Sequence, residues 1–116
     1  MEIEMATINH VRQDVAIANA RSVILWETIT ATDVGEALAL PIGGAQVGVQ
    51  MIGTFGGAVV LQGTVDGVNW VTLNDIAGTA VSLTAAGYFE ISTSVVAVRP
   101  SAAAGVSDVD VYLTVV

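Results

Sequence analysis

The chain has 116 residues, of which 53% are apolar, so it is long and apolar enough to fold as one domain and does not have the composition of a disordered chain. It contains no cysteine, which excludes a disulfide framework, a thiolate nucleophile and a cysteine metal site. Eleven acidic residues against three arginines give a formal net charge of −8, which would repel a phosphate backbone and predicts no nucleic-acid partner. Only 12% of the residues are charged. A surface with so few charged side chains suggests that other chains cover part of it.

No apolar run is long enough to cross a bilayer, so we expect no membrane partner. The first ten residues, MEIEMATINH, lack the basic and apolar regions of a signal peptide. We therefore expect a protein that is made in a cytoplasm and is used there or in a particle assembled there.

Residues 1–20 differ from the rest of the chain, because they contain no glycine and show no strict alternation of apolar and polar side chains. Val11, Val15 and Ala18 would share one face of a short helix, but an extended segment fits equally well. We interpret 1–20 as an N-terminal arm and 21–116 as a β-sandwich domain. The arm would either pack on a neighbouring chain or fray as an ordinary terminus.

From Ser22 onward the side chains alternate with the period of two that is typical of β-strands. Strand 22–29 has apolar residues on both faces, which predicts a central strand. The expected strands lie at 22–29, 37–40, 47–52, 59–64, 68–73, 81–84, 88–92, 96–98 and 108–115. About nine short strands with glycine-rich turns, Asp33-Val34-Gly35 among them, predict an all-β, antiparallel β-sandwich or jelly-roll-like domain.

A β-hairpin is predicted around Val65-Asp66-Gly67, because Asp-Gly between apolar β-formers is a strong hairpin signal. A two-residue loop would pair Val60 with Leu73 and leave both faces mixed. A three-residue loop would pair Thr64 with Val68 and separate the faces cleanly, so we favour it. One face would then carry Val59, Leu61, Val71 and Leu73, and the other Val60, Gln62, Trp70 and Thr72.

The residues assemble no catalytic set, so we expect neither an enzyme nor a bound cofactor. His10 is the only histidine, and without cysteine a zinc site would need carboxylates from scattered turns. Asp108 and Asp110 share one strand face. They could hold a hard cation such as Ca²⁺, but a solvated face that discourages edge pairing is the simpler interpretation.

Two side chains in the β region stand out as candidates for contacts. Trp70 would point away from the core face of the hairpin, either under a neighbouring loop or onto a partner chain, since aromatic residues are enriched at interfaces. Arg99 is the only arginine after Arg21, and we expect it to pair with a carboxylate such as Glu90 or Asp75, within the chain or across an interface.

The stretches AVVLQGTVDGVNWVTL (58–73) and VRPSAAAG (98–105), followed by an alternating strand, resemble the small virion proteins of tailed bacteriophages, most closely those of the capsid decoration or cement type. In such proteins the pattern V-x-L-x-G-S-x-D-G-x-N-W-x-x-L recurs, with a later R-P and a small-residue turn. Here Thr64 replaces the serine, and the alanine-rich turn departs from the expected polar and glycine residues. The matching positions are Val59, Leu61, Gly63, Asp66, Gly67, Asn69, Trp70 and Leu73.

The resemblance covers about 47–116 and implies a role in the virion, on the exterior of the capsid. A protein of this type binds the outside of the head as a trimer and clamps neighbouring subunits of the major capsid protein against the pressure of packaged DNA. A partner that binds only the assembled shell stabilises it by mass action. The contact residues that this role implies are Ile3, Met5, Ile8, His10, Val11, Arg12, Trp26, Trp70 and Arg99.

Two alternatives stay open. A carbohydrate- or receptor-binding module would use exposed aromatic side chains beside polar groups, and Trp70, Tyr88 and Tyr112 are the candidates; the D-G-x-N-W hairpin also occurs in carbohydrate-binding sandwiches of the discoidin type. A tail or head-completion protein of the virion would form hexameric or twelvefold rings, so the subunit count distinguishes it from a decoration protein.

Overall fold

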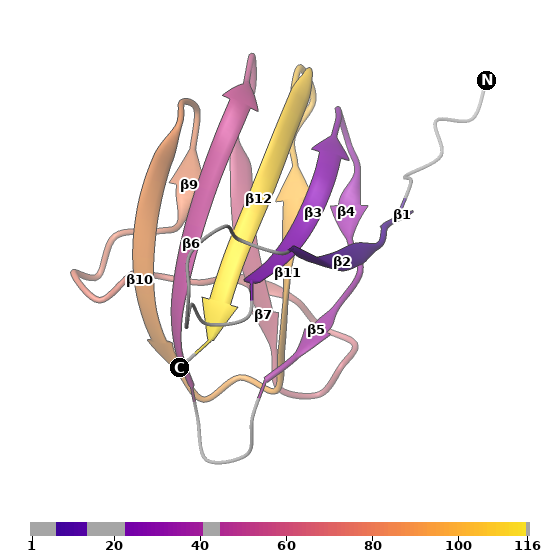
Figure 1. Ribbon diagram of the computed structural model, residues 1–116. Helices are drawn as coiled ribbons and strands as arrows, with labels where there is room; N and C mark the ends of the chain where they lie inside the picture. Colours follow the sequence, from indigo (N-terminus) through magenta and orange to yellow (C-terminus); the bar gives the residue numbers. More distant parts are fainter. Residues whose placement is uncertain (1–6, 14–22, 41–44, 116) are drawn as a thin grey trace.

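The computed structural model describes residues 7–13, 23–40 and 45–115, in which two β-sheets pack face to face as a sandwich (Figure 1). The five-stranded sheet, nearer the viewer, has the order β10 (Gly87–Thr93), β6 (Ala45–Thr54), β12 (Asp108–Val115), β3 (Val23–Ile29) and β2 (His10–Gln13). The seven-stranded sheet behind it has the order β1 (Thr7–Ile8), β4 (Val34–Gly35), β11 (Ala97–Ala102), β7 (Val59–Thr64) and β8 (Val71–Thr72), with β5 (Leu38–Ala39) beside β11 and β9 (Ser82–Leu83) beside β7. The predicted all-β sandwich is confirmed.

The core lies between the sheets and is built by side chains that alternate along the strands. On β12, Val109, Val111 and Leu113 are fully buried, as the sequence pattern predicts. β6 pairs antiparallel with β12 on one side and with β10 on the other, and Met51 of β6 and Ile91 of β10 lie in the same core. The opposite sheet contributes the buried side chains Val59, Leu61 and Val98.

β3 pairs with β12 on one side and with β2 on the other, so it lies inside its sheet as predicted. The pairing of β12 with β3 shifts between Val109 and Val111, which marks a β-bulge. Beside the bulge, Thr28 has a φ of 58°, and its N–H donates to Oδ1 of Asp110 at 2.9 Å. Asp110 therefore stabilises an irregular part of the sheet.

The described part of the predicted arm forms two edge strands. β1 pairs in parallel with β4 of one sheet, and β2 pairs antiparallel with β3 of the other, so residues 7–13 join the edges of both sheets. The extended interpretation is right for these residues and the helical one is wrong. Residues 1–6 and 14–20 of the predicted arm lie outside the described residues.

The turn predicted at Asp33-Val34-Gly35 lies earlier in the chain. The N–H of Asp33 donates to the carbonyl of Thr30, and the Asp33 carboxylate accepts hydrogen bonds from the N–H and the hydroxyl of Thr30 at 2.9 and 2.8 Å. Val34 and Gly35 are therefore released to form β4. None of the described residues forms a helix that is long and apolar enough to cross a membrane.

Candidate functional site

The connection between β7 and β8 is longer than either predicted hairpin. Gln62 pairs with Thr72 and Gly63 with Val71, so residues 65–70 all belong to the loop, and both predicted registers are wrong. The face assignment holds for Leu61 and Leu73, which are buried. It fails for Val71, whose side chain is 61% exposed.

Asp66 is the centre of this loop, which we call the Asp66 loop (residues 65–70). Its Oδ1 accepts hydrogen bonds from the N–H groups of Val68 and Asn69, both at 2.8 Å, and from the hydroxyl of Thr64 at 3.0 Å. Its Oδ2 accepts from the Asn69 side-chain amide at 2.7 Å. Gly67 takes a φ of 79°, which favours glycine, and its N–H donates to the Thr64 hydroxyl. Hydrogen bonds from a side chain to nearby backbone groups compete with strand pairing, so they favour this longer loop over the tight hairpin.

The same hydrogen bonds favour the ionised form of Asp66. The N–H groups of Asn69 and Val68, then the Asn69 side chain, hold the pKa of this carboxyl well below its ordinary value. The carboxyl group therefore stays ionised well into the acid range in the folded protein.

Acid is expected to destabilise the folded protein through Asp66. Because the folded-state pKa is depressed, its stabilisation is complete above the unfolded-state pKa of about 3.9 and is lost as the pH falls from there through the folded-state pKa. We expect Asp66→Asn to be less stable than the parent protein at pH 7 and to approach it at acid pH. Urea unfolding of both proteins from about pH 7 to pH 2 measures this. A stability difference that is constant over the range would show that the carboxylate is not the stabilising group.

The Asp66 loop presents apolar side chains to solvent. Val65 and Val68 are 72% and 77% exposed, Val71 follows directly, and exposed Val96 lies beside them because its N–H donates to the carbonyl of Thr64. A rigid loop that carries exposed valines is typical of a contact surface. The exposure of these valines was not predicted, because Val68 and Val71 were assigned to a strand and Val65 only to the turn. Their position next to a predicted turn was the available signal.

Arg99 lies on the outer face of the seven-stranded sheet, next to the Asp66 loop. Its guanidinium carbon is 4.3 Å from the ring centroid of Trp70, and its Nε donates to Oε1 of Gln62 at 3.0 Å. Within the described residues it makes no ion pair with Glu90 or Asp75, so that expectation is wrong for this chain by itself. Burial lowers the pKa of Arg99, although a guanidinium remains charged at neutral pH. The side-chain amide of Gln62 and the ring of Trp70 thus hold the Arg99 guanidinium in a fixed orientation.

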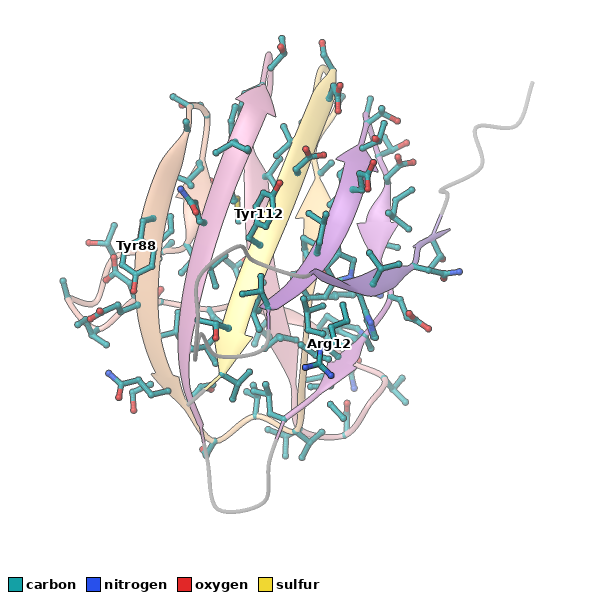
Figure 2. The ribbon with its side chains drawn as sticks, in the orientation of Figure 1. Arg12, Tyr88 and Tyr112 are labelled. Atoms are coloured by element: carbon teal, nitrogen blue, oxygen red, sulfur yellow. The ribbon has the colours of Figure 1, made fainter. Side chains whose placement is uncertain are left out.

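The contact residues predicted at the N-terminus are distributed along β1 and β2. Ile8 is half-buried against the core, and Val11 and Arg12 are exposed (Figure 2 labels Arg12). The backbone N–H and Nε2 of His10 both lie 3.3 Å from Oε1 of Glu36, which anchors β2 to the sandwich. Ile3 and Met5 lie outside the described residues.

Trp26 is not available for a contact in this conformation, because its side chain is 0% exposed. Its indole N–H donates to the carbonyl of Glu36 at 3.0 Å, and the His10 ring packs edge-on against it with 5.8 Å between the centroids. The sequence predicted Trp26 to be a partner contact. The structure places it in the core, where the indole satisfies its one donor.

The described residues contain no group of three or more histidine, cysteine or acidic side chains that could hold a metal ion. Asp110 is engaged at the β-bulge by Thr28. Asp75, another acidic side chain in a turn, accepts hydrogen bonds from the N–H groups of Ala77 and Thr79. These carboxylates therefore stabilise backbone geometry, and the surface of the Asp66 loop with Arg99 is the stronger candidate for function.

Comparisons with known proteins add one likeness. No protein-family model matches the chain, and a search of curated proteins finds no match. Among solved structures, the chain is similar to the crystal structure of the SPBc2 prophage-derived protein YomS, with a TM-score of 0.64 and 12% sequence identity. The likeness covers 88% of this chain and 100% of that one. At this identity, what the two proteins share is the fold.

Proposed function

We propose that this chain is a structural protein of a tailed-bacteriophage virion, of the capsid decoration or cement type, which binds the outside of the assembled head as a trimer. The observation that carries the proposal is the fold shared with a prophage-derived protein over 88% of the chain. It agrees with the resemblance of residues 58–73 and 98–105 to phage virion proteins. The fold likeness supports a phage protein, and the decoration role itself rests on the motif resemblance.

The Asp66 loop is the surface that we assign to the capsid contact. Its valine side chains are exposed, and its backbone is already ordered by the Asp66 hydrogen bonds, so little conformational entropy is lost on binding. Arg99 beside the loop offers a fixed positive charge in a chain of net charge −8. An acidic side chain of the major capsid protein would fit there, next to the apolar contact.

Decoration of heads provides the test. Heads are purified from the phage that encodes the chain after its gene has been deleted, and purified protein is added back. We expect light scattering to give a trimer in solution, and we expect co-sedimentation with heads together with a higher temperature of DNA release. A stable trimer that does not bind heads would refute the decoration role. A hexameric or twelvefold ring would favour the tail or head-completion role instead.

Charge placed on the Asp66 loop is expected to break this contact. Val68→Asp should weaken head binding on the order of tenfold or more, because it buries an unpaired carboxylate in an apolar contact. Ile76→Asp is the matched control, since Ile76 is 62% exposed on a different connection. Equal binding by Val68→Asp and the parent protein would show that the Asp66 loop does not face the capsid.

A further inference from the structure

The outer face of the five-stranded sheet carries a row of side chains that crosses all five strands. Val11 of β2 pairs with Leu25 of β3, Leu25 with Tyr112 of β12, Tyr112 with Gln50 of β6, and Gln50 with Tyr88 of β10. Figure 2 shows Tyr88 and Tyr112 on the face turned to the viewer, on either side of β6. Two strand spacings separate them, roughly 10 Å.

A hollow of about 290 Å³ lies between the two tyrosines. Gly48 forms its floor, because a Cβ atom there would lie 3.2 Å from Oη of Tyr88 and 3.4 Å from Cγ2 of Thr114. Tyr88 therefore leans over the glycine, and its hydroxyl donates to Oε1 of Glu90 at 3.1 Å. The residue as a whole is still 59% exposed. The volume is close to the lower end of the range for small-molecule sites.

The chemistry of the hollow selects the kind of ligand. Among the described residues that line it there is no lysine or arginine, and Glu90 lies at its edge, so these residues offer no positive charge to an anionic ligand. Its walls are largely apolar, but the Tyr112 hydroxyl and the Gln50 amide, which bond to none of the described residues, can both donate and accept hydrogen bonds. A sugar ring has the complementary surface, with C–H groups on its faces and hydroxyl groups around its rim.

We propose that the hollow between Tyr88 and Tyr112 is a binding subsite for one neutral sugar residue of a glycan. The exposed ring of Tyr88 packs against the C–H face of the sugar, as aromatic rings do with weakly positive C–H groups. Gln50 and the hydroxyl of Tyr112 bind the hydroxyl groups of the rim. The site lies on the sheet opposite to the one that carries the Asp66 loop and Arg99, so it does not depend on the proposed capsid contact.

Titration of the full chain with neutral sugars tests the proposal. The probes are glucose, galactose, mannose, N-acetylglucosamine and their short oligomers, with a proline-rich peptide as comparator, because aromatic grooves also bind proline. Amide chemical shifts report the binding. We expect at least one sugar to give saturable shifts at Gly48 and Gln50, with a Kd on the order of 1 mM, which is suitable for a small and shallow site.

Variants decide whether the hollow is the site. Tyr88→Ala and Tyr112→Ala should each weaken sugar binding on the order of tenfold. Tyr88→Phe should retain most of it, because the ring is kept, and Trp70→Ala, an aromatic change on the other sheet, should leave it unchanged. The proposal is overturned if no sugar saturates, if only the peptide does, or if both alanine variants bind as the parent protein does. Head binding is measured separately on the same variants, so failure of the subsite leaves the decoration role intact.

Discussion

Replacing Trp26 with alanine is expected to lower the free energy of unfolding by about 3–5 kcal/mol, as for other large buried aromatic residues. The side chain is 0% exposed and lies where β3 meets β2 and the segment after β4. The substitution leaves a cavity and removes the donor that satisfies the Glu36 carbonyl. Since domains of this size are stable by about 5–15 kcal/mol, the loss would be a large part of the total. Urea unfolding followed by circular dichroism measures it.

Two further variants separate the causes of the Trp26 effect. Trp26→Phe keeps most of the volume and loses the N–H, so it should cost about 1–3 kcal/mol. Trp70→Ala should cost only about 1 kcal/mol, because that ring is half-buried and packs against the Arg99 guanidinium at the surface. If Trp26→Ala were no more costly than Trp70→Ala, the indole would not be part of a close-packed core.

Replacing Gly53 with alanine is expected to cost about 2–5 kcal/mol, from backbone strain and overpacking together. Gly53 has a φ of 132°, and a Cβ atom there would lie 2.1 Å from the carbonyl oxygen of Asp108 and 3.0 Å from the Cα of Val109. Both are backbone atoms of β12, which pairs with β6 at this point. Backbone atoms in a paired strand cannot move aside by a rotation, as the end of a side chain could. The pairing of the two strands must therefore open locally. Thermal and urea unfolding measure the loss.

Gly67→Ala is the matched control. Gly67 also has a positive φ, 79°, but no atom lies within 4 Å of the added methyl group. The cost should then be only that of the left-handed conformation, about 1–2 kcal/mol. If the two variants lost equal free energy of unfolding, the contact between the added methyl group at Gly53 and β12 would not be destabilising.

Local patterns predicted the features that depend on neighbours in the chain. The alternation of Val109, Val111 and Leu113 with polar residues identified the core face of β12, because successive side chains of a strand point to opposite faces whatever the partner strand is. The Asp66-Gly67 dipeptide marked the position of the chain reversal, because the conformational preferences of turn residues are also local, but the loop runs over 65–70 and is longer than predicted. The register around it was not, because the Asp66 carboxylate accepts four hydrogen bonds that no alternation of apolar residues records.

Local patterns did not predict the contacts between residues that are far apart in the sequence. The Trp26 side chain was expected to reach a partner, yet His10, Glu36 and the opposite sheet enclose it. Arg99 was expected beside a carboxylate, and it lies on Gln62 and Trp70 because β11 pairs with β7 in that register. The sequence alone did not predict that two aromatic side chains would lie close together on the surface of the sandwich. The register of two strand pairs, β10 with β6 and β6 with β12, brings Tyr88 and Tyr112 into one row on either side of Gln50.

By itself, the sequence determined that this chain is an all-β sandwich and where most of its strands lie. Those properties follow from the composition and from the alternation of apolar and polar side chains along each strand, which can be recognised without knowing the partner strands. Tertiary structure alone decided which strands are neighbours, that residues 7–13 supply one edge strand to each sheet, and that Val65 and Val68 are exposed. The physical reason is that strand partners are chosen by burial and hydrogen bonding summed over the whole molecule, to which each local segment contributes only a small part.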